Sequence, residues 1–292
     1  MAVIEEKIAK PLGWTVEEAA AGIYDLAAVN MADALRTVSI ERGYDPRDFT
    51  FFAYGGGLGI FAVEVARRLG CPSVVVPDNS SAFSAQGVLM ADYVRQYNRT
   101  VNWIIADGSQ VERVNQTLEE IRAAAIEDAR RDGVSEDALS FSVSGDGCFA
   151  GQVWEITVPL PDRPLTAEDG ATLAASFPST YERAYGPGTA WLDSPPLMVN
   201  VALTATMRRP KPHMREQEPT AEAVRPDPAS ARSVFLPVER RSETVPVYAE
   251  ADLTPGATVE GPAIVDVGDT TVFVPTGAVC GRDRFFNFTI SI

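Results

Sequence analysis

Four glycines separate a strand-like run from a helix-like run in the first quarter of the chain. Phe49–Tyr54 is short, apolar and aromatic, Ile60–Leu69 has helical spacing, and Ser73–Pro77 is a second strand-like run. The glycines are Gly55, Gly56, Gly57 and Gly59. Glycine lets the backbone approach a ligand closely, and the first N–H groups of the following helix point at that ligand with the positive end of the helix dipole. The arrangement predicts a loop that binds the phosphates of a nucleotide.

The spacing alone leaves the ligand open. Gly57-x-Gly59-x-x-Ala62 matches the alanine variant of the dinucleotide fingerprint, and Asp78 ends the next strand, where a ribose-binding carboxylate belongs. This interpretation predicts NAD. Against it, a long helix expected over Thr15–Arg42 precedes the unit, and few further βα units follow. A single GxGxxA is a weak signal, because such glycines can also form a tight strand-to-helix turn without any ligand.

The long helix before the glycines has clear signals at both ends. Thr15 and Glu18 fit a capping box, and Gly43 fits a C-terminal stop. A mostly apolar stripe recurs along it at helical spacing, which predicts that this face packs against the rest of the protein. Its members are Ile23, Leu26, Ala27, Asn30, Ala34, Val38 and Arg42.

The chain divides into four segments by its pattern of residues. Residues 1–98 are predicted to be α/β, because two strands joined by a helix imply a parallel, buried sheet. Residues 99–209 mix long helices, including one over 109–132, with alternating strands and are predicted to be α+β. Residues 210–232 are rich in proline and charge, which predicts a linker. Residues 233–292 carry short strands between PG, EGP, VGD and PTG turns, which predicts a small all-β, barrel-like module.

The composition excludes several classes of partner. With 46% hydrophobic and 22% charged residues, the 292-residue chain is typical of soluble globular proteins. No apolar run approaches the roughly 18 residues of a membrane span. The formal net charge of −15 argues against nucleic acid and anionic membrane as partners, because both favour basic surfaces. The start MAVIEEKIAK lacks the pattern of a signal peptide, so we expect a cytoplasmic protein.

Outside the glycine stretch, the sequence offers few candidates for chemistry. His213 is the only histidine and lies in the proline-rich segment, so a Ser-His-Asp or Cys-His arrangement is not expected, and the catalytic residues stay unknown. Asp146 and the pair Asp266 and Asp269 could bind a cation, but aspartates in such turns more commonly shape the turn. We therefore predict no metal site made by this chain alone. Three tryptophans are expected in a core or an interface: Trp103, Trp154 and Trp191.

Several motifs together resemble the C-terminal half of the hydantoinase A/5-oxoprolinase family, to which acetone and acetophenone carboxylase subunits belong. The resemblance follows the chain in order over nearly its whole length. The matching stretches are Glu41–Phe49 (ERGYDPRDF), Gly55–Ala62, Pro77–Asp92, Phe149–Glu155 and Gly261–Pro275 (GPAIVDVGDTTVFVP).

The resemblance implies an actin/hexokinase-like ATPase fold for the first segment. In that fold the glycines after the strand face ATP, accompanied by Mg²⁺, rather than NAD. It also implies that Asn30 and Arg36, on the neighbouring helix, line the cleft, and it removes the reason to expect Asp78 at a ribose. The residues expected to contact ATP are Gly55, Gly56, Gly57, Gly59, Asn30 and Arg36.

Two departures from the family pattern stand out. The Asp-x-Gly-Gly-Thr hairpin that holds phosphates and metal in such ATPases is missing from this sequence. We expect a second polypeptide to supply that lobe, and the Mg²⁺ site to be shared with it or located on it; the alternative is that the chain is an excised fragment. In addition, Phe61 stands where the family has histidine, so any polar contact of that histidine is lost.

By resemblance, the chain is a subunit of a hetero-oligomeric ATP-dependent carboxylase of the acetophenone/acetone type and is inactive alone. The family chemistry implied is phosphorylation of a ketone enolate and of bicarbonate by ATP, followed by C–C bond formation on a partner subunit. A close rival is ATP-dependent opening of a hydantoin, 5-oxoproline or another lactam. The chain could also be a non-catalytic scaffold or, more distantly, an NAD-binding protein.

Overall fold

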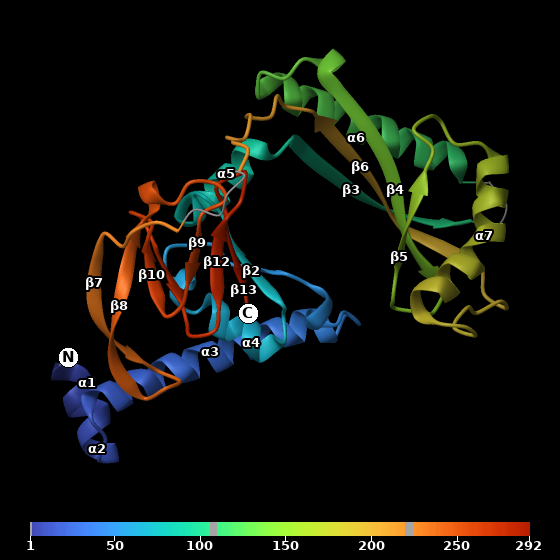
Figure 1. The fold of residues 1–292 in the computed structure, drawn as a ribbon. Coiled ribbons are helices and arrows are strands. Elements are labelled where there is room, and N and C mark those ends of the chain that lie inside the picture. Colours follow the sequence, from blue (N-terminus) through green and yellow to red (C-terminus); the bar gives the residue numbers. More distant parts are fainter. Residues whose placement is uncertain (1, 106–109, 220–224) are drawn as a thin grey trace. The chain divides into compact units, whose positions relative to one another are not determined.

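The computed structural model of the chain describes residues 2–105, 110–219 and 225–292 (Figure 1). The chain forms two compact units. The loop unit, which contains the glycine stretch, comprises Met1–Leu89 and Pro212–Ile292, and the inserted unit comprises Met90–Lys211. Each unit has its own sheet or sheets and its own hydrophobic core. No helix in the described part of the chain is long and apolar enough to cross a membrane.

In the described residues, two open sheets build the loop unit. Their strand orders are β1-β2-β13-β12-β9 and β11-β10-β8-β7. The strands are β1 (Phe51–Phe52), β2 (Ser73–Val76), β7 (Ser230–Leu236), β8 (Arg241–Ala249), β9 (Thr258–Glu260), β10 (Ala263–Asp266), β11 (Thr271–Val274), β12 (Val279–Arg282) and β13 (Phe288–Ser291).

The C-terminal strands join the N-terminal ones instead of forming the separate barrel-like module predicted over 233–292. β13 pairs antiparallel with β2, with Phe288 opposite Val76, and neither sheet closes into a barrel within the described ranges. The physical reason is the shortness of β1 and β2, because an isolated pair of such strands is marginally stable at best. Val74 of β2 shares one core with residues of β9 to β13. Residues 1–89 and 212–292 therefore depend on each other.

The helices of the loop unit begin and end close to the predicted signals. Their bounds are α1 (Ala2–Ile4), α2 (Lys10–Leu12), α3 (Val16–Ile40), α4 (Ala62–Leu69) and α5 (Phe83–Met90), with a π turn over Glu5–Ala9. The capping box at the start of α3 is confirmed: Glu18 N donates to Thr15 Oγ1 over 3.1 Å, and Thr15 N donates to Glu18 Oε2 over 2.8 Å.

The face of α3 that is buried differs from the one predicted. Ala28 and Ala32 pack against Val65 of α4, because alanine lets two helices approach closely. The predicted stripe instead faces outward, with Leu26 61% and Val38 55% exposed. Both stripes have helical spacing, so periodicity alone did not distinguish them. The apolar outer stripe of α3 is left without a cover in the described part of the chain.

The inserted unit combines helices with one antiparallel sheet. Its sheet has the antiparallel order β3-β6-β4-β5. The elements are β3 (Tyr93–Ile104), α6 (Val111–Arg131), β4 (Leu139–Phe149), β5 (Ile156–Leu160), α7 (Ala167–Tyr185) and β6 (Pro196–Met207). Val114 and Ile121 of α6 and the buried Trp103 of β3 belong to one core. The expected helix over 109–132 is confirmed from residue 111, whereas residue 109 lies outside the described residues.

Arg282 of β12 connects three segments of the loop unit. Its side chain is only 3% exposed. Nε donates to Phe286 O over 3.1 Å, and Nη1 donates to Glu250 O and Leu253 O over 2.8 and 3.3 Å. Nη2 donates to Asp78 Oδ1 over 2.7 Å and to Glu250 Oε1 over 2.6 Å. One guanidinium thus satisfies two carboxylates and three carbonyls, which the compact ammonium of a lysine could not reach together.

We expect Arg282→Met to destabilise the protein by about 2 kcal/mol, measured by urea unfolding. The magnitude is below the range for a fully buried pair, because both carboxylates stay about a third exposed. Arg284→Met is the matched control, since Arg284 is about half exposed and pairs with Glu216 at 3.4 Å. We expect the control to change stability by less than about 0.5 kcal/mol. Equal losses in the two variants would contradict the role given to Arg282.

The start of α7 predicts a pH dependence. Arg163 donates to both carboxylate oxygens of Asp169, over 2.7 and 2.8 Å, and Thr166 N donates to the same carboxylate. Hydrogen bonds from Arg163, and then from Thr166, hold the pKa of Asp169 below its ordinary value. A carboxyl with a lowered folded-state pKa stabilises the fold above its unfolded pKa of about 4 and loses this contribution as the pH falls.

Asp169→Asn should therefore lower the melting temperature at pH 7, and the difference from the parent protein should shrink as the pH falls from about 4 towards the folded pKa. Asp137→Asn is the control, because Asp137 is exposed. It should leave the melting temperature unchanged both at pH 7 and below pH 4. A pH-independent difference for Asp169→Asn would mean that its charge is not what stabilises the helix start.

Candidate functional site

The glycine loop lies between the end of β2 and the turn that joins β10 to β11. Gly55 N donates to Ser80 O over 2.7 Å, and Thr270 Oγ1 donates to Gly56 O over 2.8 Å. The Ser81 hydroxyl donates to Asp269, so the two flanking segments are also bonded to each other. The loop is therefore held from both sides, and one of these sides comes from the C-terminal stretch of the chain.

The four glycines meet three different requirements. Gly55 has a φ of +98°, which an L side chain rarely adopts. A Cβ on Gly59 would lie 2.4 Å from Thr271 O, so only glycine fits against β11. Gly56 and Gly57 do not have positive φ angles, and no described atom lies within 4 Å of a Cβ placed on either. Neither the backbone conformation nor internal packing therefore explains why these two exposed residues are glycine. Because they have no side chain, their backbone is open to solvent.

Phe61 packs against Tyr24 of α3. Its ring stacks on Tyr24, with 4.8 Å between centroids and 16° between planes, and Tyr24 Oη donates to Ile60 O over 3.0 Å. Burial, with smaller contributions from Glu64 and other neighbouring charges, raises the pKa of Tyr24. The phenol therefore stays neutral at physiological pH, and Phe61 serves packing.

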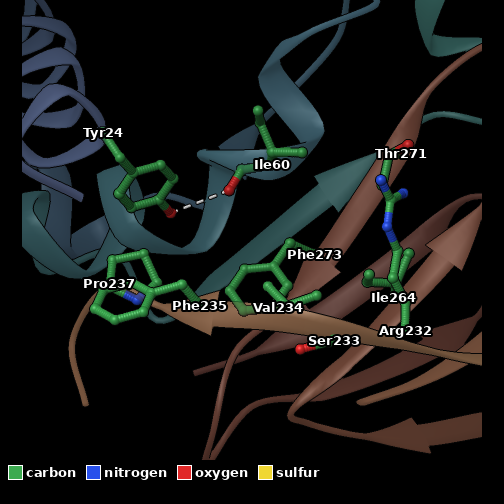
Figure 2. A pocket seen from close by; sticks show the side chains of 10 residues that line it. All are labelled: Tyr24, Ile60, Arg232, Ser233, Val234, Phe235, Pro237, Ile264, Thr271 and Phe273. Carbon is green, nitrogen blue, oxygen red and sulfur yellow. Dashed lines mark hydrogen bonds between the residues drawn. The ribbon is translucent and has the colours of Figure 1, made fainter. Parts of the chain in front are cut away.

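A cavity of about 440 Å³ lies beside the loop (Figure 2). This volume falls within the range of about 300 to 1,000 Å³ typical of small-molecule sites. Tyr24 and Ile60 lie on one side, and Val234, Phe235 and Phe273 lie opposite them. The remaining lining residues are Arg232, Ser233, Pro237, Ile264 and Thr271. Thr271 also meets Gly59, so the cavity and the glycine loop share a wall.

Among the described residues, the two predicted residues of α3 make no side-chain hydrogen bond to the glycines. Arg36 pairs with Asp33 and donates to Arg68 O, near the C-terminal end of α4, whereas the loop precedes the N-terminal end of that helix. Asn30 is exposed on α3, and its side chain has no hydrogen bond among the described residues. The place of Asn30 and Arg36 in an ATP cleft therefore stays a prediction.

The aspartates considered as ligands have other partners. Asp78 accepts from the buried Arg282 instead of standing free for a ribose. Asp146 accepts from Thr157 Oγ1 over 2.6 Å, and Asp266 accepts from the backbone of its own turn. Within residues 2–105, 110–219 and 225–292, no group of three or more His, Cys, Asp or Glu side chains is placed to hold a metal ion.

Sequence inspection missed the residues that shape the loop from outside. Ser80 is 1% exposed, and Thr270 is also buried. Ser80 belongs to the stretch Pro77–Asp92 and Thr270 to Gly261–Pro275, both of which carry the family resemblance. The motif residues could therefore have been found, but their position beside the glycines could not be read from chain order.

Comparison with known proteins assigns the chain to a family. The Hydantoinase/oxoprolinase profile matches residues 2–97, and the profile of the Hydantoinase/oxoprolinase C-terminal domain matches residues 106–290. The chain therefore belongs to the hydantoinase/oxoprolinase family, which confirms the resemblance carried by its motifs.

Relatives within this family are subunits of known enzymes. The chain is 30% identical to caprolactamase subunit alpha of Pseudomonas jessenii over 94% of its own length and 39% of that protein. It is 30% identical to the acetone carboxylase beta subunit of Xanthobacter autotrophicus, over 94% and 39% of the two chains. A nucleotide-free structure of acetone carboxylase superposes with a TM-score of 0.80 at 26% identity, covering 99% of this chain and 42% of that one. The chain spans about two fifths of the length of these relatives.

The different requirements at the glycines predict different responses to a single methyl group. Gly59→Ala should destabilise the protein by about 2 kcal/mol or more, because the new Cβ meets backbone that cannot yield easily. Gly56→Ala and Gly57→Ala should each change the free energy of unfolding by less than about 0.5 kcal/mol. Thermal unfolding of the three variants measures this directly. A loss at Gly56 or Gly57 as large as that at Gly59 would show that internal packing, and not access, requires glycine there.

Proposed function

We propose that this chain is a subunit of a hetero-oligomeric, ATP-dependent enzyme of the acetone/acetophenone carboxylase type and that it contributes part of the ATP cleft. Family membership and the ATP-dependent acetone carboxylase relative support this assignment. The observation that carries the proposal is the pair of exposed glycines, Gly56 and Gly57, for which packing offers no reason.

The loop and the adjoining cavity suggest a division of work. We assign phosphate binding to the backbone around Gly56 and Gly57, with Gly55 and Gly59 shaping the loop, because bare N–H groups bind anions without a counter-charge. The apolar cavity between Tyr24 and Phe273 is our candidate for the less polar part of the nucleotide. ATP, when bound, would supply the phosphoryl group that activates the substrate. The role proposed for the glycine loop and the cavity residues of this chain is to bind ATP and orient it.

The rest of the cleft is proposed to come from a partner. Relatives of this chain are named as enzyme subunits, and the family resemblance implies a further lobe with the Asp-x-Gly-Gly-Thr hairpin of actin-like ATPases. We propose that a second polypeptide carries this lobe and most of the Mg²⁺ ligands. The uncovered outer stripe of α3, with Leu26 and Val38, is consistent with further protein packing on the loop unit.

A cyclic amide hydrolase is the second candidate. The relationship to caprolactamase subunit alpha, at 30% identity, favours it as much as the relationship to acetone carboxylase favours a carboxylase. The two chemistries share ATP use but differ in their second substrate, a ketone with bicarbonate or a lactam with water. Substrate-dependent ATP hydrolysis with each class, measured on the assembled enzyme, separates them.

The proposal predicts that the isolated chain hydrolyses no ATP, whereas the complex formed on co-expression with the polypeptides encoded beside it shows substrate-dependent ATPase activity. Gly56→Val and Gly57→Val should each lower that activity at least tenfold, because the branched side chain occupies the space assigned to the phosphates. Gly87→Val is the matched control, since Gly87 is an exposed glycine of α5 with nothing within 4 Å among the described atoms.

The outcomes separate the candidate functions. Strong ATP turnover by the isolated chain would contradict the shared cleft. Unchanged activity in Gly56→Val and Gly57→Val would favour a scaffold subunit, in which the loop and Phe61 only pack. Tight binding of NADH, measured by fluorescence, would support the dinucleotide interpretation in place of ATP.

A further inference from the structure

Two neighbouring loops of the inserted unit expose four large apolar side chains. Val153 is 83%, Trp154 72%, Trp191 52% and Leu192 77% exposed. We call these four residues the tryptophan patch. Tryptophan on a surface is uncommon without a partner, because a buried aromatic side chain removes roughly 150 to 250 Å² of poorly solvated surface from water.

The backbone that carries the patch is held in place. Gln152 Nε2 donates to Thr189 O over 3.0 Å, and Ser194 Oγ donates to Ala150 O over 2.9 Å, so each loop is bonded to the other. The Tyr181 hydroxyl, on α7, donates to the carbonyl of Trp154 over 2.8 Å.

Trp191 also lies against the adjoining loop. A Cβ on Gly151 would meet its ring at 3.2 Å, so Gly151, with a φ of +97°, makes room for the indole. Apolar anchors on such a fixed backbone lose little conformational entropy on binding, which is the property of interface hot spots.

The charges around the patch narrow the choice of partner. Glu155 directly follows Trp154 and Asp193 directly follows Leu192, and both carboxylates are exposed. The whole chain has a formal net charge of −15. A second copy or an anionic lipid surface would bring negative charge against negative charge, which costs binding free energy. A complementary surface has an apolar pocket bordered by lysine or arginine.

We propose that the tryptophan patch is the docking surface for a different polypeptide of the same assembly, one that presents an apolar pocket with a basic rim. The relatives of this chain are named as subunits, which supports an assembly of unlike chains. The inference rests on the proposed hetero-oligomer but not on its ATP chemistry. Trp154 and Trp191 are the anchors, and Glu155 and Asp193 pair with the rim.

The test uses the full chain and the polypeptides encoded beside it, purified together after co-expression and then titrated against each other. The double variant Trp154→Ala/Trp191→Ala should weaken their association at least 30-fold while the melting temperature of the free chain stays within a few degrees. Val94→Ala, at an exposed apolar residue of β3, is the control and should bind normally. Glu155→Lys/Asp193→Lys should slow association and remove its salt dependence.

Intrinsic fluorescence provides a second measurement. If Trp154 and Trp191 only stabilised the fold, their emission would not change when the partner is added. Emission of the exposed indoles should shift to shorter wavelength when the partner binds, and iodide quenching should fall. Trp154→Phe/Trp191→Phe should lose this response and keep most of the affinity.

Four results would overturn the proposal. They are undiminished association of the double alanine variant, failure of the co-expressed polypeptides to associate with the parent chain, a patch-dependent dimer of the chain alone in light scattering, and patch-dependent binding to vesicles of phosphatidylcholine and phosphatidylserine. An assembly that forms through the tryptophan patch but hydrolyses no ATP would instead contradict the proposed function and still support the docking surface.

Discussion

The antiparallel pairing of β2 with β13 is the contact on which the loop unit depends. It joins two stretches of chain that the whole inserted unit separates, and it places Val74 and Ile290 in one core. The strand before the glycines belongs to this sheet, and Thr270 holds Gly56 across a sequence separation of 214 residues. The shape of the glycine loop consequently depends on contacts with distant parts of the chain, although the glycine motif itself is a local sequence feature.

Local features of the fold were predictable because their causes lie within a few residues. The capping box at Thr15, the helix α6 and the strand-to-helix position of the glycines all follow from neighbouring side chains. Strand pairing was not predictable from the sequence. Alternation of apolar and polar residues shows which face of a strand is buried, but not which strand lies beside it. The short strands within residues 233–292 therefore suggested a separate barrel. The single stripe predicted on α3 was not the buried face, because Ala28 and Ala32 pack against α4 instead.

The site shows the same limit. Glycine is required by a positive φ at Gly55 and by a close contact at Gly59, whereas Gly56 and Gly57 face open space. These roles differ only in the folded structure, so the sequence could not separate them. Arg36 was expected in the cleft because the family resemblance places its helix beside the glycines, and Asp78 was considered as a ribose ligand because it ends the next strand. In space one contacts the far end of α4 and the other a buried arginine.

The split of the loop unit across the chain also sets an order for folding during synthesis. Met90–Lys211 is a contiguous stretch and can collapse as soon as it has left the ribosome. β2 meets β13 only after another 200 or so residues have been made, which takes roughly 10 to 40 s at common elongation rates. Until then β2 has an unpaired edge and the glycine loop lacks Thr270. A nascent chain therefore has no finished glycine loop until β13 has been made, and the ligand binding proposed for this loop could begin only then.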